Sequence, residues 1–325
     1  MKKVLVLGGT GFLGRHLCEK LVRNGMTLTV PTRRLRNAAD VMMLPMLYVA
    51  EADVHDPAAL AELVRGHDAV INLVAILQGN EKSFHRAHVE LAEKVARACD
   101  STGVRRLIHV SALGADARNP GALPSLYLRS KSEAEKLLKA APLSLTILRP
   151  SVMFGAGDRF LNVFADLQGM LPVVPLAGAN ARFQPVWVED VASAIAHCVD
   201  ERQTHSTEGI TFEACGPDIH TLRELVRMAG QYSGANQGKG RPVLALPDGL
   251  ARLQARFMEL LPGEPLLSRD NLDSMKVDNI ATGNLPGLAE LGITPASLAA
   301  IAPSYLGAQG PRSGLMAKRR TAGRF

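Results

Sequence analysis

The sequence of 325 residues predicts an α/β fold: a parallel, doubly wound sheet with a smaller, mainly C-terminal α/β domain. Two observations predict this class. Short β-branched segments alternate with amphipathic helical patterns up to about residue 150, and a glycine-rich turn joins the first segment to the first helix. The second half has more proline and glycine and alternates less regularly, which indicates a separate domain.

The elements follow in order along the chain. Apolar residues at helical spacing predict a helix that begins at Leu13 and stops at Gly25, and another over Phe84–Cys99. Further helices are expected near 159–169, 189–200, 221–230 and 249–261. Six strands are expected in the first half: Val4–Leu7, Leu28–Val30, Leu47–Val49, Ala69–Leu73, Leu107–Val110 and Leu145–Leu148.

The composition excludes several classes of protein. With 47% apolar and 21% charged residues the chain is neither disordered nor fibrous. Its longest apolar runs are far below the roughly 18 residues that span a bilayer. Four widely separated cysteines argue against a zinc cluster or a disulfide framework. These features predict a cytoplasmic protein without a metal site, with peripheral contact at the inner membrane face left open.

The net charge of +6 first suggests a nucleic acid or an acidic membrane as partner. Most of it lies after Gly307, in a segment that reads as a flexible basic tail over 307–325. Without the tail the chain has 32 basic and 31 acidic residues, so we expect no nucleic-acid binding. The tail remains a candidate for contact with anionic lipid or an acidic partner. Its basic residues are Arg312, Lys318, Arg319, Arg320 and Arg324.

The glycine-rich turn between the first strand and the first helix predicts a dinucleotide site. Gly8 suits a tight turn, Gly11 lets the backbone approach a pyrophosphate, and Gly14 allows close packing of helix against strand. The free N–H groups of the helix N-terminus then bind the phosphates. An ordinary strand–helix turn is the alternative. The expected contacts are Gly8, Thr10, Gly11, Phe12, Leu13 and Gly14.

The end of the second strand favours NADP(H) over NAD(H). It carries Thr32, Arg33 and Arg34 and no acidic residue; a guanidinium binds the 2′-phosphate of NADP, which a carboxylate would repel. A solvated basic loop is the alternative, and NAD(H) stays possible. Asp53 and Val54, after the third strand, are candidate adenine contacts, although Asp53 also suits a loop or helix cap. The end of the fourth strand is placed to border the dinucleotide through Leu73, Val74 and Ala75.

Tyr127 and Lys131 are four residues apart and so share one helix face. A free tyrosine has a pKa of about 10, too high for a base at neutral pH. A neighbouring ammonium and a positive nicotinamide ring are expected to lower it, so that Tyr127 relays a proton while hydride moves to or from the cofactor. A chance pair on a solvated helix face is the alternative.

The glycine turn and the Tyr127–Lys131 pair resemble the short-chain dehydrogenase/reductase superfamily. The segments Leu148–Gly155 and Val186–Ala192 are similar to those of its extended and atypical members. More narrowly, the stretches Ser125–Lys131 and Leu267–Asn271 resemble bacterial relatives of the NAD(P)H-binding accessory subunit of respiratory complex I. The likeness runs from residue 1 to about 306. The resemblance implies a Rossmann-type sheet. It also implies that Pro150 and Val152, in the segment Leu148–Gly155, contact the cofactor.

The resemblance also implies a catalytic hydroxyl after the fifth strand, and here the sequence departs from the pattern. Ser111 is the only hydroxyl present, and in another register the position falls on Ala112. His88 stands about where the superfamily has an active-site asparagine. These departures put turnover in doubt without affecting cofactor binding.

Two functions therefore stay open. The first is an NADP(H)-dependent oxidoreductase, epimerase or dehydratase on a carbonyl or alcohol, with Tyr127, Lys131 and Ser111 as catalytic residues and a link to quinones or respiration. The second is a non-catalytic protein that holds NADPH within, or during assembly of, a respiratory NADH:quinone oxidoreductase-like complex. The sequence assigns neither a substrate nor an oligomeric state.

The expected domains are a dinucleotide-binding domain over 1–150, to which a segment near 185–215 returns, and a substrate or partner domain over 151–306. In the second domain an amphipathic stripe stands out. A core or substrate-lid helix is its default interpretation, and a lipid- or partner-facing surface is the alternative. The stripe consists of Leu250, Leu253, Phe257, Leu260 and Leu261.

Overall fold

A computed structural model describes residues 2–200, 207–260 and 267–307. The chain forms two compact units. The first comprises Met1–Pro150, Glu189–Ala214 and Ala281–Thr294, and the second comprises Ser151–Val188, Cys215–Ile280 and Pro295–Phe325. Beyond Gly307, the segment expected to be a basic tail lies outside the described residues.

The first unit is built on a seven-stranded sheet in the order β11-β6-β5-β4-β1-β2-β3, in which every pair is parallel. This confirms the predicted Rossmann-type sheet and all six expected strands. A seventh strand, contributed by a later part of the chain, pairs with β6. The strands are β1 Lys3–Leu7, β2 Thr27–Thr32, β3 Leu47–Glu51, β4 Ala69–Asn72, β5 Arg106–Val110, β6 Ser144–Pro150 and β11 Thr211–Ala214.

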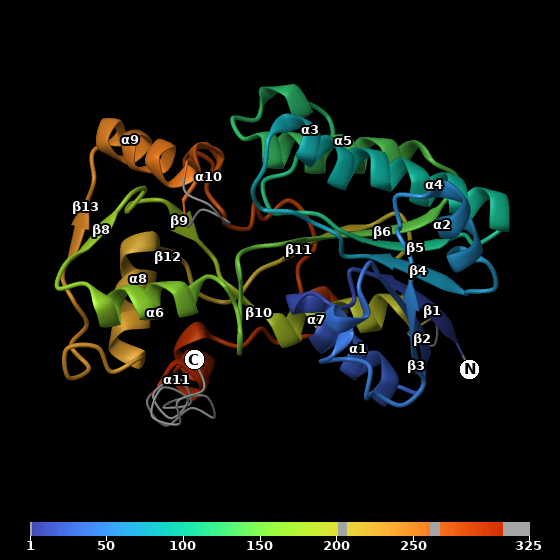
Figure 1. The fold of residues 1–325 in the computed structure, drawn as a ribbon, viewed down its shortest axis with the longest axis horizontal. Helices are drawn as coiled ribbons and strands as arrows, with labels where there is room; N and C mark the ends of the chain where they lie inside the picture. Colours follow the sequence, from blue (N-terminus) through green and yellow to red (C-terminus); the bar gives the residue numbers. More distant parts are fainter. Residues whose placement is uncertain (1, 201–206, 261–266, 308–325) are drawn as a thin grey trace. The chain divides into compact units, whose positions relative to one another are not determined.

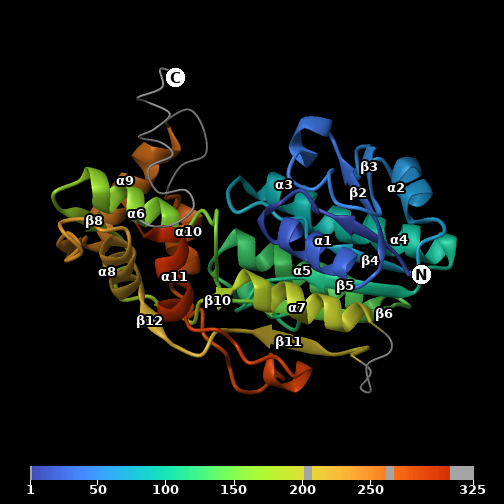
Figure 2. The same cartoon turned by 90° about the horizontal axis from the view of Figure 1, so that it is seen from below.

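Helices cover both faces of this sheet (Figure 1). Helices α1 Phe12–Arg23 and α7 Val188–Val199 lie on one face, and Figure 2 shows them side by side. The other face is covered by α2 Pro57–Val64, α4 Leu91–Thr102 and α5 Leu126–Ala140. Between the two layers, leucines and valines of the central strands are fully buried. Short 3₁₀ helices complete the unit at Leu35–Ala38, Pro120–Ala122 and Ala289–Leu291.

The helix expected over Phe84–Cys99 has a break near its start. It consists of α3 Glu81–Phe84, a π-helical turn over His85–Glu90, and α4. The extra residue of a π-turn rotates the following residues relative to a regular helix, and such turns are frequent at functional sites. Apolar spacing does not reveal this irregularity, because the residues on both sides remain helical.

The second unit packs short strands against helices around two small apolar clusters, one of which contains Phe154, Leu161 and Leu298. The described part of the chain includes no helix long and apolar enough to cross a membrane. The elements are β7 Met153–Phe154, α6 Leu161–Met170, β8 Val174–Leu176, β9 Arg182–Phe183, β10 Val186–Trp187, β12 His220–Thr221, α8 Leu222–Tyr232, β13 Val243–Ala245, α9 Asp248–Glu259, α10 Arg269–Ser274 and α11 Leu298–Leu306.

The default interpretation of the stripe on α9 as a core helix is wrong for its described residues. Helix α9 buries two alanines, Ala251 and Ala255, and turns its large apolar side chains outward. Leu261 lies outside the described residues. The exposed members of the stripe are Leu250, Leu253, Phe257 and Leu260.

Candidate active site

The predicted site residues of the first unit gather at the carboxyl ends of its strands. The glycine turn follows β1, Leu73 follows β4, and Ser111 follows β5. Because β1, β4 and β5 are neighbours in a parallel sheet, these ends lie at the same edge. In open α/β sheets this edge is where ligands bind.

The glycine turn has the close backbone packing that a dinucleotide-binding turn needs. Gly8 has a φ of 81°, and a Cβ there would lie 3.2 Å from the backbone nitrogen of Val74. A Cβ on Gly14 would lie 2.4 Å from the carbonyl oxygen of Gly8, closer than real Cβ atoms approach. The turn therefore lies directly against the segment after β4, which the sequence also assigned to the cofactor.

Helix α1 begins beside this turn with its first N–H groups available to an anion. Its N-cap is Gly11, no side chain caps it, and its first turn has no acidic residue. The N–H groups of a first helical turn have no partner within the helix, and the helix dipole adds partial positive charge there. Gly8, Gly11 and Gly14 thus fit a pyrophosphate by their shape and by their hydrogen-bond donors.

The end of β2 presents a group of exposed basic side chains. Arg33, Arg34 and Arg36 are exposed, and none has an ion pair within the described residues. The backbone between them is ordered by Thr32, whose hydroxyl donates to the Arg34 carbonyl at 3.1 Å. Asp40, the nearest acidic residue along the chain, pairs with Arg15 instead. The guanidinium groups are therefore free to bind a phosphate.

The remaining predicted cofactor contacts are placed unevenly. Val54 is half-buried, whereas Asp53 is exposed and accepts the His55 N–H at 3.0 Å in a local turn. Val152 belongs to the second unit, where its N–H donates to Asn279 at 3.0 Å. The other predicted contacts lie at strand ends of the first unit. Leu73, Val74 and Ala75 follow β4, and Pro150 is the last residue of β6.

Tyr127 and Lys131 lie one turn apart on α5, which Ser125 caps by accepting the Leu128 N–H. Lys131 is 1% exposed, and its ammonium donates to the Val110 carbonyl at 3.1 Å. This bond brings Lys131 to the end of β5, next to Ser111. A solvated chance pair is therefore wrong for Lys131, which is held inside the protein.

Burial dominates the ionisation of both groups. It raises the pKa of Tyr127 to about 12, so the expected lowering of the tyrosine pKa is not found in the protein itself. Burial also lowers the pKa of Lys131 to about 8, against the opposing effect of the Glu135 carboxylate. At neutral pH Tyr127 is thus a protonated phenol, and Lys131 is mostly a cation. This pair is poised to donate a proton rather than to accept one.

Ser111 is the hydroxyl at the end of β5. Its N–H donates to the Leu148 carbonyl at 2.8 Å, which fixes its backbone against β6. Its hydroxyl oxygen is buried and has no hydrogen-bond partner within the described residues. A buried polar atom of this kind usually has a partner, so Ser111 is available to a ligand. The next residue, Ala112, is also buried and offers no hydroxyl.

His88 links the segment after β4 to helix α5. Sequence spacing did not reveal this role. Its Nε2 accepts the Ile76 N–H at 3.1 Å, so the ring proton must lie on Nδ1, which donates to the Ser130 hydroxyl at 2.8 Å. That hydroxyl donates to the Tyr127 carbonyl at 2.9 Å. The His88 ring also meets the Tyr127 ring edge-on, with centroids 5.6 Å apart. The only sequence signal was a histidine at a position where the superfamily has asparagine.

Two buried histidines predict loss of stability in acid. Burial lowers the pKa of His88 to about 2 and that of His109 to about 3. Below the ordinary value of 6.5 the unfolded chain takes up protons that the folded protein does not, so acid favours unfolding. We expect the unfolding free energy to fall below pH 6.5 by up to about 1.4 kcal/mol per pH unit for each histidine.

Urea unfolding between pH 4.5 and 8 measures this slope. A His88→Asn variant should lose the share of His88 and retain that of His109. An unchanged slope in this variant would contradict the assignment.

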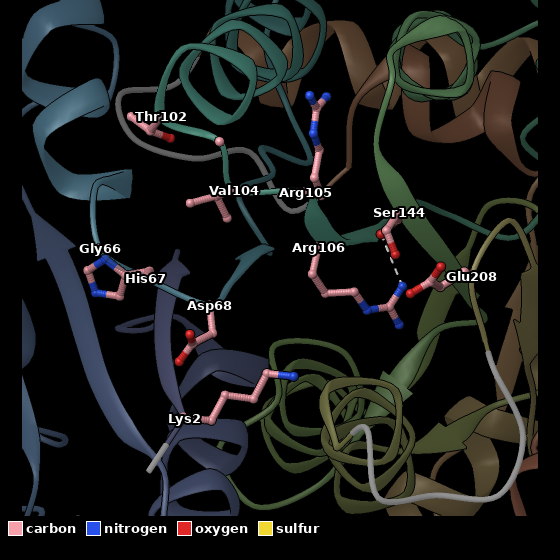
Figure 3. Close-up of a pocket in the computed structure, with 11 residues that line it drawn as sticks. Lys2, Gly66, His67, Asp68, Thr102, Val104, Arg105, Arg106, Ser144 and Glu208 are labelled. Atoms are coloured by element: carbon pink, nitrogen blue, oxygen red, sulfur yellow. Dashed lines mark hydrogen bonds between the residues drawn. The ribbon is translucent and has the colours of Figure 1, made fainter.

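A pocket lies at the edge of the sheet where the strands begin, opposite the edge that carries the candidate site (Figure 3). It has a volume of about 760 Å³ and is lined by residues that precede or begin strands, among them Lys2, Arg105 and Arg106. Arg106 is buried and donates to the Cys198 carbonyl at 2.7 Å, and Lys2 donates to the Val199 carbonyl at 2.8 Å. These cations satisfy carbonyl groups at the C-terminal end of α7, where the helix dipole favours positive charge.

The parallel sheet, the glycine turn and the half-buried Tyr127 one helical turn from the buried Lys131 define a dinucleotide-binding protein of the short-chain dehydrogenase/reductase type. Residues 8–202 match a family described as NAD(P)H-binding. The chain belongs to this family.

Relatives extend the likeness over most of the chain. It is 32% identical to the rat mitochondrial protein NADH dehydrogenase (ubiquinone) 1 alpha subcomplex subunit 9, over 90% of the chain and 76% of that protein. It is 30% identical to a ceramide reductase of Caulobacter vibrioides, over 75% of the chain and 74% of the reductase. An NADPH-dependent quinone oxidoreductase from Escherichia coli has the same fold, with a TM-score of 0.70 and 19% identity over 93% of this chain and 99% of that one.

Proposed function

We propose that the chain is an NADP(H)-dependent oxidoreductase that reduces a carbonyl group, with Tyr127 as the proton donor. One observation carries the proposal: Lys131 is buried one turn from Tyr127 and bonded to Val110, beside the Ser111 hydroxyl, which has no partner in the part of the chain that the structure describes. A protonated phenol, an ammonium and a free hydroxyl at the carboxyl edge of the sheet are the groups that carbonyl reduction needs. Epimerase or dehydratase chemistry would use the same pair.

NADPH, when bound, would supply the hydride that reduces the carbonyl carbon. Tyr127 gives its phenolic proton to the carbonyl oxygen as that oxygen gains negative charge. The Lys131 ammonium stabilises the tyrosinate that remains, and the Ser111 hydroxyl donates a hydrogen bond to the same carbonyl oxygen. Gly8, Gly11 and Gly14 would hold the pyrophosphate, and His88 fixes Tyr127 through Ser130.

The relatives support a class of substrate. Ceramide reductase acts, by its name, on a lipid, and it aligns with three quarters of this chain. The mitochondrial relatives are subunits of an NADH:ubiquinone system, by name. Long-chain ketones and quinones are therefore the carbonyl compounds to test first. Purified protein should be denatured and the released nucleotide identified, after which NADPH consumption with these compounds tests turnover.

We expect NADPH to stabilise the protein more than NADH. A charged hydrogen bond from Arg33 or Arg34 to the 2′-phosphate contributes about 1.5–3 kcal/mol, or roughly tenfold or more in affinity. Thermal shifts with matched concentrations of the two nucleotides measure the preference. An Arg33→Gln/Arg34→Gln variant should bind both equally, and Arg97→Gln on α4 is the control. Equal shifts in the unaltered protein would refute the role of the arginines.

A second function is supported by a specific observation. The chain aligns over 90% of its length with a subunit of a respiratory complex. A protein that holds NADPH without turning it over, in such a complex or in its assembly, would keep the glycine turn and need no reaction at Tyr127. Nucleotide release without NADPH consumption on any tested carbonyl would favour this alternative.

A further inference from the structure

Helix α9 in the second unit is packed with its small side chains inward and its large apolar side chains outward. Ala251 is 2% exposed and Ala255 is fully buried. The outward residues follow one another at intervals of three or four, so they form one stripe along the helix. This apolar ridge consists of Leu250 (55% exposed), Leu253 (65%), Phe257 (65%) and Leu260 (77%).

Ion pairs at both ends of the helix hold this orientation. Arg252 donates to Asp273 at 2.9 Å, and Glu259 accepts from Arg269 at 2.8 Å. Both partners belong to α10, so α9 and α10 are tied together at two points. Turning the ridge inward would break these bonds and expose the buried alanines. The ridge is therefore a fixed surface of the second unit.

We propose that the apolar ridge inserts into the interfacial layer of an anionic lipid membrane. Leucine and phenylalanine on one face of a helix, with arginine beside them, are typical of helices that lie in such an interface. Arg256 lies next to Phe257, is exposed, and has no ion-pair partner within the described residues. Four side chains of one helix are far fewer than the roughly 20–30 residues that each partner contributes to a stable protein interface.

The charge of the same unit favours an anionic surface. Helix α11 ends at Leu306, and the sequence from Gly307 to Phe325 has five basic residues and no acidic one. Stable membrane attachment usually needs two such signals, an apolar one and a basic one. The proposal does not depend on turnover at Tyr127.

Sedimentation of the full-length protein with vesicles tests the proposal. Vesicles of phosphatidylcholine with phosphatidylglycerol should bind the protein, and vesicles of phosphatidylcholine alone should bind it more weakly. Leu253→Gln/Phe257→Gln should weaken binding at least about tenfold, because each apolar side chain contributes well over 1 kcal/mol when it leaves water. Lys318→Gln/Arg319→Gln/Arg320→Gln should weaken binding to anionic vesicles and reduce its salt dependence.

Met43→Gln is the matched control, because Met43 is 85% exposed in the first unit and should not change binding. Unaltered melting temperatures establish that the variants are folded. Failure to bind either kind of vesicle, or equal binding by the ridge variant and the unaltered protein, would overturn the proposal. A lipid-free dimer that the ridge variant abolishes would also overturn it, and would assign the ridge to a second copy of the chain.

Discussion

Replacing Gly14 with alanine is expected to weaken NADPH binding at least about tenfold and to destabilise the protein by about 1–3 kcal/mol. The added Cβ would lie 2.4 Å from the Gly8 carbonyl oxygen and 2.6 Å from the Gly9 carbonyl carbon. All of these neighbours are backbone atoms, so no side chain can move aside. Either α1 shifts away from β1 or the glycine turn opens, and both changes displace the N–H groups that we expect to bind the phosphates.

The control for this variant is Gly169→Ala, in helix α6. A Cβ at Gly169 would meet no atom within 4 Å, so the same substitution adds a methyl group without a clash. Alanine in a helix is favoured over glycine by about 0.5–1 kcal/mol, so this variant should be unchanged or slightly more stable. Thermal unfolding with and without NADPH measures both quantities. A Gly14→Ala variant with unaltered affinity would show that the turn does not hold the phosphates.

The part of the fold that was predicted from the sequence depends on local signals. The glycine turn, the six strands of the first half and α1 each follow from residues that are adjacent in the chain. Strand β11 was not predicted as a strand, because its four residues become one only by pairing with β6, more than 60 positions earlier. The segment 281–294, which joins the first unit, contains no strand and gives no periodic signal.

For the candidate site too, the sequence predicted the features that depend on local spacing and missed those that depend on contacts between distant segments. Residue spacing placed Tyr127 and Lys131 on one helix face, and the structure agrees. The ionisation of both groups depends also on burial beneath other elements, which spacing does not encode; in the protein without its cofactor, burial raises the pKa of Tyr127. The contacts of His88 with Ile76 and Ser130 join residues from three segments. On α9, the apolar period was clear, but whether its stripe faces the core depended on Ala251 and Ala255 packing there instead.

Tyr127→Phe is expected to reduce the rate of NADPH oxidation by a carbonyl substrate about 10²- to 10⁴-fold, the usual contribution of a general acid. Removing one oxygen atom leaves the ring contacts with His88 and Phe84, so the fold and NADPH affinity should be retained. Tyr48→Phe is the matched control. Tyr48 lies on β3 with 66% of its surface exposed, and the same substitution there should leave the rate unchanged.

The pH dependence of the same reaction separates Tyr127 from Lys131. Because the pKa of Lys131 is lowered to about 8, its ammonium loses a proton as the pH rises through that value, and the rate should fall there. Lys131→Met should be slow at every pH and lack this fall. If the unaltered protein oxidises NADPH and Tyr127→Phe does so equally fast, Tyr127 is not the proton donor. If the protein releases NADPH on denaturation but never consumes it, the Tyr127–Lys131 pair supports cofactor binding alone, as the non-catalytic alternative requires.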